Sequence, residues 1–334
     1  MDGFSARIDP EITAEVATML AQLGRTEDVC FSPSNTVMAV AGYLKNSMCL
    51  FDVAFDLSGD TPRIRINGWT DIRSDALNEP HGMAFIGETK LVVANRKGKV
   101  TVFDTARAGF SGDVLNIDPL RVIDRANAFH HVKTPGSVCV ARQTEREAEI
   151  LVCNNFLHHV TRHRFPLRGG PALPRNAIVL DKHLDIPDGI ATDPDLRRVA
   201  ISNHGTQEVL LFDAARLNAT ADPVGRLKET GYAHGLRFFD GGRQLCVADA
   251  GAPLIRFYRS DDRAWCGEIL PERVVRVLDD ETFLRGRDNE AEGGPKGIAL
   301  DATETVLVTT CEKQPLAFFH LSALLAGAPD TGNS

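Results

Sequence analysis

The sequence predicts an all-β protein, a six-bladed β-propeller with four-stranded blades. Three observations favour this fold: a short apolar strand recurs six times, two further strands follow each copy in the same order, and no long stretch shows the 3.6-residue periodicity of an amphipathic helix. The copies lie roughly 50 residues apart, which suits one four-stranded blade with variable loops. We therefore expect residues 1–334 to form a single propeller domain.

Each copy begins with a tight turn that leads into an inner strand. The strands are short and rich in small or β-branched residues, as expected for strands that pack on both faces. In all copies but the first, a glycine follows the turn and allows close approach of a neighbouring strand. The blades are predicted to begin near residues 27, 81, 135, 188, 234 and 296.

Outer strands are predicted before the next opening turn, at residues 63–69, 120–125, 176–182, 225–230 and 273–279. The sixth blade lacks such a segment, so we expect terminal segments to close the ring and to cover the open sheet edge. Residues 15–23 could supply the missing strand. An equally good interpretation is a helix over residues 10–23, because Ala, Leu, Met and Glu favour helix.

Composition excludes several classes of function. A net charge of −8 opposes binding to nucleic acid, which usually needs a basic surface. Neither a signal sequence nor an apolar run long enough to cross a bilayer is present, so we predict a cytoplasmic protein without a membrane partner. The seven cysteines show no metal-binding spacing and are predicted to be buried thiols.

The residue that enters each inner strand varies from copy to copy, and six blades would arrange these residues as a ring around the channel. The ring is predicted to contain Glu27, His81, Pro135, Asp188, His234 and Lys296. Copies three apart lie on opposite sides of the channel, so His81 faces His234 and Glu27 faces Asp188. Two imidazoles and two carboxylates suit a divalent transition metal. We predict these four as metal ligands, with Glu27, Asp188 and Lys296 as catalytic residues.

A second ring is expected on the same face, where the second strand of each blade ends. Its predicted members are Gly42, Asn95, Asn154, Asn203, Asp249 and Thr310. We expect Asn95, Asn154, Asn203 and Asp249 to bind the substrate, together with Tyr232 at the rim. Taken singly, such residues are ordinary turn formers or solvated charges, and only their registration across the repeat indicates a site.

No other sequence motif indicates a catalytic site, so any chemistry is expected from the residues of the two rings. Phosphate-binding loops, nucleophile elbows, HExxH and dinucleotide motifs are absent. The charged segment 280–294 is either a lid over the mouth or a solvated loop.

The pattern PHG or PDG, then VAN or VAD, then a strand ending in FD resembles the NHL-repeat and gluconolactonase-like (senescence marker protein) six-bladed propellers over residues 27–321. In that family an early Glu, an Asn and the Asp of a PDG turn hold calcium, which Glu27 and Asp188 resemble, whereas Pro135 stands where the Asn is expected. His81 and His234 resemble the zinc ligands of peptidylglycine amidating lyase, which uses three such histidines.

The residues and the resemblance together predict a small-molecule enzyme, a hydrolase such as a lactonase or a lyase. A divalent cation (Zn, Fe, Mn or Ca) in the channel is expected to polarise a carbonyl or activate water. Two other hypotheses stay open at this point. The mouth could bind a peptide or protein partner without catalysis, or the same ring could perform metal-free acid–base chemistry.

Overall fold

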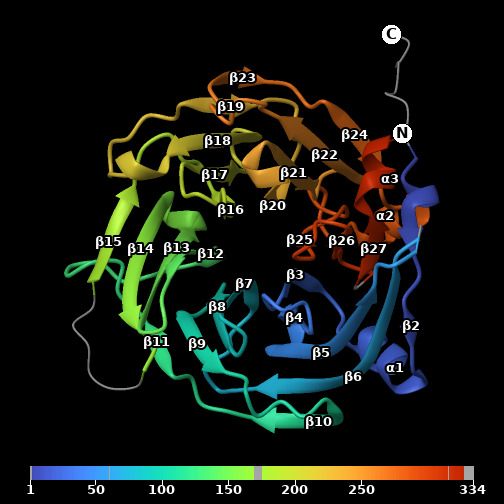
Figure 1. Ribbon diagram of the computed structural model, residues 1–334. Coiled ribbons are helices and arrows are strands. Elements are labelled where there is room, and N and C mark those ends of the chain that lie inside the picture. The colour runs from blue at the N-terminus through green and yellow to red at the C-terminus, as the bar shows by residue number, and fades with distance from the viewer. Residues whose placement is uncertain (1, 60, 169–174, 315, 327–334) are drawn as a thin grey trace.

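The computed structural model describes residues 2–59, 61–168, 175–314 and 316–326. Six sheets stand around a central axis, with the strands β3, β7, β12, β16, β20 and β25 innermost (Figure 1). Each sheet contains four strands that follow one another outward from the axis, and two sheets carry additional edge strands. The predicted six-bladed β-propeller is therefore confirmed.

The first three blades contain residues from the N-terminal half of the chain. Blade 1 consists of β3 (Thr26–Phe31), β4 (Val37–Gly42), β5 (Ser47–Asp56) and β6 (Arg63–Arg73), with β2 (Glu11–Ile12) and β10 (Ser111–Asn116) added to its outer edge. Blade 2 consists of β7 (Pro80–Ile86), β8 (Lys90–Asn95), β9 (Val100–Asp104) and β11 (Arg121–Ile123). Blade 3 consists of β12 (Pro135–Gln143), β13 (Glu147–Asn154), β14 (His159–Pro166) and β15 (Arg175–Leu180).

The remaining blades complete the ring. Blade 4 consists of β16 (Pro187–Thr192), β17 (Arg198–Asn203), β18 (Glu208–Asp213) and β19 (Gly225–Leu227), with β23 (Gly267–Ile269) beside β19. Blade 5 consists of β20 (Ala233–Phe239), β21 (Gln244–Asp249), β22 (Leu254–Arg259) and β24 (Arg273–Arg276). Blade 6 consists of β25 (Ile298–Leu300), β26 (Val306–Thr309), β27 (Ala317–His320) and β1 (Arg7–Ile8).

The short helices lie outside the sheets. The α-helices are α1 (Ala14–Gln22), α2 (Asp280–Gly286) and α3 (Leu321–Ala326). Single 3₁₀ turns cover Phe4–Ala6, Tyr43–Lys45, Asn155–Leu157, Ala214–Arg216 and Asp240–Gly242. Across the described part of the chain, no helix combines the length and the apolar character needed to cross a bilayer.

The N-terminal segment closes the ring as predicted, but through different residues. β1 pairs antiparallel with β27, with Arg7 opposite Phe319 and Ile8 opposite Phe318. Residues 14–22 form the helix α1, so the strand interpretation of 15–23 is wrong and the helix interpretation is confirmed. The Thr13 side chain accepts a hydrogen bond from the Val16 backbone N–H and thereby caps α1.

The hydrophobic core lies between the blades. Each buried cluster in the described residues joins two neighbouring sheets; one, for example, packs Val29 and Val40 of blade 1 against Val308 and Phe318 of blade 6. Both faces of every sheet are therefore covered, which explains why the second strands are continuous apolar runs with no alternation of polar residues. The polar side chains that remain available for chemistry are directed to the channel and its ends.

Candidate metal and catalytic site at the channel mouth

A β-bulge at the entry of the inner strand directs a side chain into the channel in blades 1, 2, 4 and 5. In blade 1 the register shifts between Thr26 and Val29, and corresponding shifts occur in blades 2 to 5. A bulge re-aims a side chain and interrupts regular pairing. Glu27 lies at this point in the first blade, and His81, Asp188 and His234 lie there in theirs.

The strand register corrects one member of the predicted ring. Pro135 pairs with Asn154 as Pro187 pairs with Asn203, so Gly136 is the counterpart of Asp188. Pro135 therefore precedes the ring position, and blade 3 contributes a glycine there. A Cβ at Gly136 would lie 2.7 Å from Asp188 Oδ1, so the missing side chain leaves room for this carboxylate.

Close packing of the inner strands explains the glycine that follows the ring residue. A Cβ at Gly189 would lie 1.8 Å from the backbone oxygen of His234, and a Cβ at Gly235 would lie 2.5 Å from that of Lys296. Any larger residue would push neighbouring blades apart. In blade 1 this place is taken by Asp28, whose carboxylate accepts a hydrogen bond from the Met83 backbone N–H at 2.8 Å.

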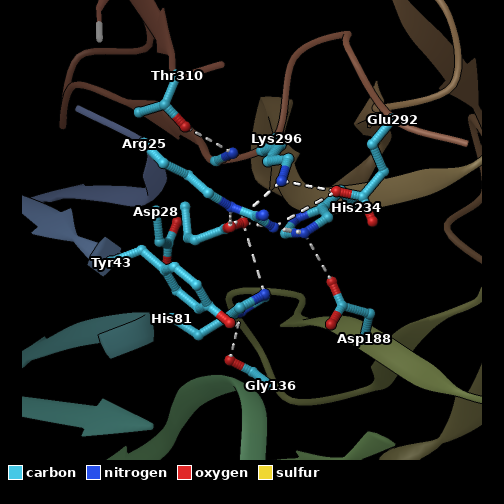
Figure 2. A network of polar contacts seen from close by, with 12 residues as sticks. Arg25, Asp28, Tyr43, His81, Gly136, Asp188, His234, Glu292, Lys296 and Thr310 are labelled. Carbon is cyan, nitrogen blue, oxygen red and sulfur yellow. Dashed lines mark hydrogen bonds and ion pairs between the residues drawn. The ribbon is translucent and has the colours of Figure 1, made fainter. Parts of the chain in front are cut away.

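His81, His234 and Asp188 of the ring point toward one another (Figure 2). The His81 and His234 rings stack with centroids 5.1 Å apart. Glu27 Oε2 lies 3.6 Å from Nε2 of each histidine, and Asp188 Oδ2 lies 3.1 Å from His234 Nε2. All four side chains are buried. The opposition of His81 to His234 and of Glu27 to Asp188 thus brings all four groups to one point.

These side chains present a donor set that fits a divalent cation. One ligand atom each from Glu27, His81 and His234 lies within 4.8 Å of the others. Glu27 Oε2 and Asp188 Oδ2 are buried and have no hydrogen-bond partner among the described residues. Unpartnered buried carboxylate oxygens are costly, and a cation would satisfy them. Imidazole nitrogen with carboxylate oxygen suits Zn, Fe or Mn, whereas Ca prefers oxygen ligands alone.

His81 is held in one neutral tautomer. Its Nδ1–H donates to the Gly136 carbonyl at 2.9 Å, and Arg96 Nη2 donates to its Nε2 at 2.8 Å. Burial, together with the adjacent Arg96 guanidinium, lowers the pKa of His81 to about 3. The His81 imidazole is therefore neutral at pH 7, and its unprotonated Nε2 is directed into the channel. A cation bound at Nε2 would replace the hydrogen bond from Arg96.

The two carboxylates are ionised despite their burial. Burial alone would raise the pKa of Asp188, but His234, His81 and Arg96 outweigh it and hold that pKa well below its ordinary value. Glu27 behaves in the same way, with Lys296 as the largest opposing charge, and its pKa is also lowered.

Lys296 lies in a buried charge network beside this site. Its Nζ is 2.6 Å from Glu312 Oε1, 2.7 Å from Glu292 Oε2 and 3.2 Å from Glu27 Oε1. Burial would lower the pKa of Lys296, but the carboxylates reverse this and raise it above its ordinary value. Arg25 also donates to Glu27. Lys296 is therefore a cation whose three N–H donors each have a carboxylate nearby.

Residues of the predicted second ring bond within their own blades. Asn95 Oδ1 accepts from the Asn78 backbone N–H at 3.1 Å, and its Nδ2 donates to Lys99 O at 2.8 Å. Asp249 accepts from the Tyr232 backbone N–H and forms an ion pair with Arg256 at 2.9 Å. The side chains of Asn154 and Asn203 likewise bond to their own blades. These contacts fix the entry turns, and a role in substrate binding stays a prediction.

In five of the six blades, the residue after the second-ring position contacts the site instead; in blade 5 that residue is Ala250. The side chains that do so are Tyr43, Arg96, Asn155, His204 and Glu312. In blade 6 the second-ring position is Cys311 rather than Thr310, because Thr309 pairs with Ile298 as Ile201 pairs with Ile190. Alternation along a strand is the signal that would have found them, since a shift of one residue reverses a side chain's direction.

Asn155 and His204 complete the surroundings of Asp188. Asn155 Nδ2 donates to Asp188 Oδ1 at 2.5 Å, and it fills the space opened by Gly136. His204 Nε2 lies 3.7 Å from Asp188 Oδ2, and its ring packs on Tyr232 with centroids 3.9 Å apart. Tyr232 therefore contacts the site indirectly, by packing on the His204 ring. The segment 280–294 begins with α2 and contributes Glu292 to the network around Lys296.

Comparison with known proteins supports the architecture. No protein-family model and no curated protein sequence matches the chain. A gluconolactonase from Xanthomonas campestris matches with a TM-score of 0.59 at 18% identity, covering 95% of this chain and 96% of its own. A protein described as a candidate gluconolactonase matches with a TM-score of 0.56 at 12% identity, covering 89% of each chain.

A chain of the mitotic checkpoint complex also matches, with a TM-score of 0.52 at 12% identity over 88% of this chain and 86% of its own. At these identities the comparisons establish the fold alone. The chain is a six-bladed β-propeller, a class that includes gluconolactonases.

Proposed function

We propose that the protein is a small-molecule hydrolase of the lactonase type, with a divalent cation held at the channel mouth by Glu27, His81 and His234. The observation that carries this proposal is the convergence of two imidazole Nε2 atoms on buried carboxylate oxygens that have no other partner. The similarity of the fold to a gluconolactonase supports it. A cytoplasmic location and a small-molecule substrate are part of the same prediction.

A bound cation would supply Lewis-acid polarisation of a substrate carbonyl or a lowered pKa for water. Asp188 is the proposed proton acceptor, because Asn155 fixes its Oδ1 while Oδ2, 3.1 Å from His234 Nε2, faces the site. Arg96 lies 3.4 Å from Asp188 and donates to His81, and it is placed to donate to a developing oxyanion once released.

Lys296 is proposed to position Glu27 rather than to touch the substrate. Three carboxylates surround its Nζ, so no N–H is free for a substrate oxyanion. Its charge holds Glu27 ionised and in place, with help from Arg25. This positioning role differs from the direct catalytic role that the sequence pattern predicts for Lys296.

The test begins with metal content and hydrolysis. Protein purified without a histidine tag is analysed by mass spectrometry for metals, stripped with chelator, and reloaded separately with Zn, Mn and Ca. Hydrolysis of aldonolactones is then followed by proton release. We expect Zn or Mn to restore activity and Ca to restore little, because two ligands are imidazoles. The His81→Ala, His234→Ala double variant should lose both metal and activity while keeping its circular dichroism spectrum.

Two outcomes would overturn the proposal. Activity that survives both chelator and the double substitution would assign the site to metal-free acid–base chemistry by Glu27 or Asp188, without the two histidines. A protein that binds no metal and hydrolyses no lactone, but retains a protein partner through the mouth, would be a scaffold.

A further inference from the structure

The channel opens at its other end into a cavity of about 390 Å³, lined by all six inner strands. Strand register places six residues at one level here, two positions beyond the close-packed glycine of most blades. They are Cys30, Ala84, Cys139, Ala191, Arg237 and Ala299. Five of these side chains are small, so the channel stays open at this level, and Arg237 is the long exception.

The walls of this cavity combine apolar side chains with polar groups. One position further along the strands the lining residues are Phe31, Phe85, Val140, Thr192, Phe238 and Leu300. Burial raises the pKa of the Cys30 thiol above its ordinary value and that of Cys139 to about 12, so both thiols are neutral. A concave space of this size, with apolar side chains and a few convergent polar groups, is typical of small-molecule sites.

Arg237 carries a charge that the protein only partly neutralises. It extends from blade 5 toward Asp28 of blade 1, but Nη2 remains 3.8 Å from Asp28 Oδ1. Both Asp28 oxygens already accept backbone hydrogen bonds, from Val29 and Met83. Burial raises the pKa of Asp28 above its ordinary value, although Arg237 and the two backbone hydrogen bonds oppose this. Among the described residues, Nη1 of Arg237 donates a hydrogen bond to the Leu236 backbone oxygen at 2.7 Å.

The Nε–Nη2 edge of Arg237 is therefore available, and the side chain is 27% exposed. The acidic residues at the outer rim of the cavity have other partners. Asp301 Oδ1 accepts from the Thr305 and Val306 backbone N–H groups, and Glu304 Oε2 accepts from the Asp240 backbone N–H. Arg237 is thus the cation on which an anion entering the cavity would settle.

We propose that this cavity binds a small apolar monocarboxylate. The carboxylate would pair with the Nε–Nη2 edge of Arg237 in the two-pronged geometry that guanidinium and carboxylate share. The hydrocarbon part would lie against Phe31, Phe85 and Phe238. This site is separate from the histidine-containing mouth, and its existence does not depend on the proposed hydrolase.

The test uses octanoate and its uncharged isostere octanamide, with binding measured by isothermal titration calorimetry on the full chain. We expect octanoate to bind about tenfold or more tightly than octanamide, because a charge-assisted hydrogen-bonded pair is lost in the amide. Arg237→Met should reduce octanoate affinity to that of octanamide. The matched control Arg216→Met changes an arginine that is 85% exposed and should leave binding unchanged.

A second variant keeps the test decisive if Arg237→Met proves unstable. Ala84→Leu reduces the cavity without removing the charge, and it should weaken octanoate and octanamide together. Equal affinity for the two probes in the natural sequence, undiminished octanoate binding in Arg237→Met, or no octanoate binding at all would each overturn the proposal.

Discussion

The two halves of the channel are built from the same six inner strands and differ in nearly every property. At the mouth, the bulged residues Glu27, His81, Asp188 and His234 are polar and buried. A few residues further along the same strands the side chains are small and apolar, with Arg237 as the exception. Polar groups collect where the strand leaves regular pairing, because the bulge there re-aims the side chain toward the channel.

The largest expected effect breaks the charge network at the mouth. Lys296→Met removes the cation that three carboxylates share and leaves them buried beside a single remaining guanidinium, that of Arg25. Removing one member of a buried ion network typically costs about 4 kcal/mol of unfolding free energy. Urea denaturation measures the loss. Lys313→Met, an exposed lysine, is the control and should change stability by less than about 0.5 kcal/mol.

A loss of under 1 kcal/mol in Lys296→Met would contradict this expectation. It would mean that the carboxylates take up protons readily and that the mouth does not depend on a fixed charge balance.

An intermediate effect is the loss of stability at low pH. It distinguishes a buried histidine in a blade wall from the histidines of the channel. His163 lies buried on β14, and burial lowers its pKa to about 4. The unfolded chain binds this proton near pH 6.5, so the contribution to stability is complete above pH 6.5 and is lost as the pH falls toward 4. We expect His163→Gln to remove about 2 kcal/mol of the stability loss between pH 6.5 and 4.5.

Urea titrations at several pH values give the slope for each protein. A slope that is unchanged by His163→Gln would show that the acid sensitivity does not come from this blade wall, and it would point to the histidines of the mouth.

The smallest effect concerns the other half of the channel. Arg237→Met removes a cation whose carboxylate neighbour, Asp28, already has two backbone hydrogen bonds. We expect unfolding free energy to fall by about 1 kcal/mol or less, in contrast to Lys296→Met. Thermal and urea unfolding of the two variants side by side provide the measurement. Equal losses would mean that the two halves do not differ in their dependence on charge.

The repeat made the fold predictable from sequence. The outer strands predicted at 63–69 and 176–182 correspond to β6 and β15, because β-branched residues between turns identify strands without knowledge of their neighbours. The closing strand β1 was not predicted, since two residues carry no periodicity. Its position depends on pairing with β27 at the other end of the chain, which is a tertiary effect.

The candidate site was predictable in part. His81, His234, Glu27 and Asp188 follow from registration of the turns. Asn155 was not predicted, because a β-bulge shifts the strand register by one residue. A pattern of short turns in the sequence does not show where a bulge lies.

Closure by β1 also limits when the protein can fold during synthesis. Arg7 pairs with Phe319, so the sixth blade requires residues that leave the ribosome after those of the other five blades. Until then, the inner strands of blades 1 and 6 cannot enclose the channel, and Glu27 cannot meet Lys296. The first five blades can form in sequence as they emerge, whereas the charged mouth is assembled only in the final step. A ribosome-arrested chain ending before β27 should therefore lack the site entirely.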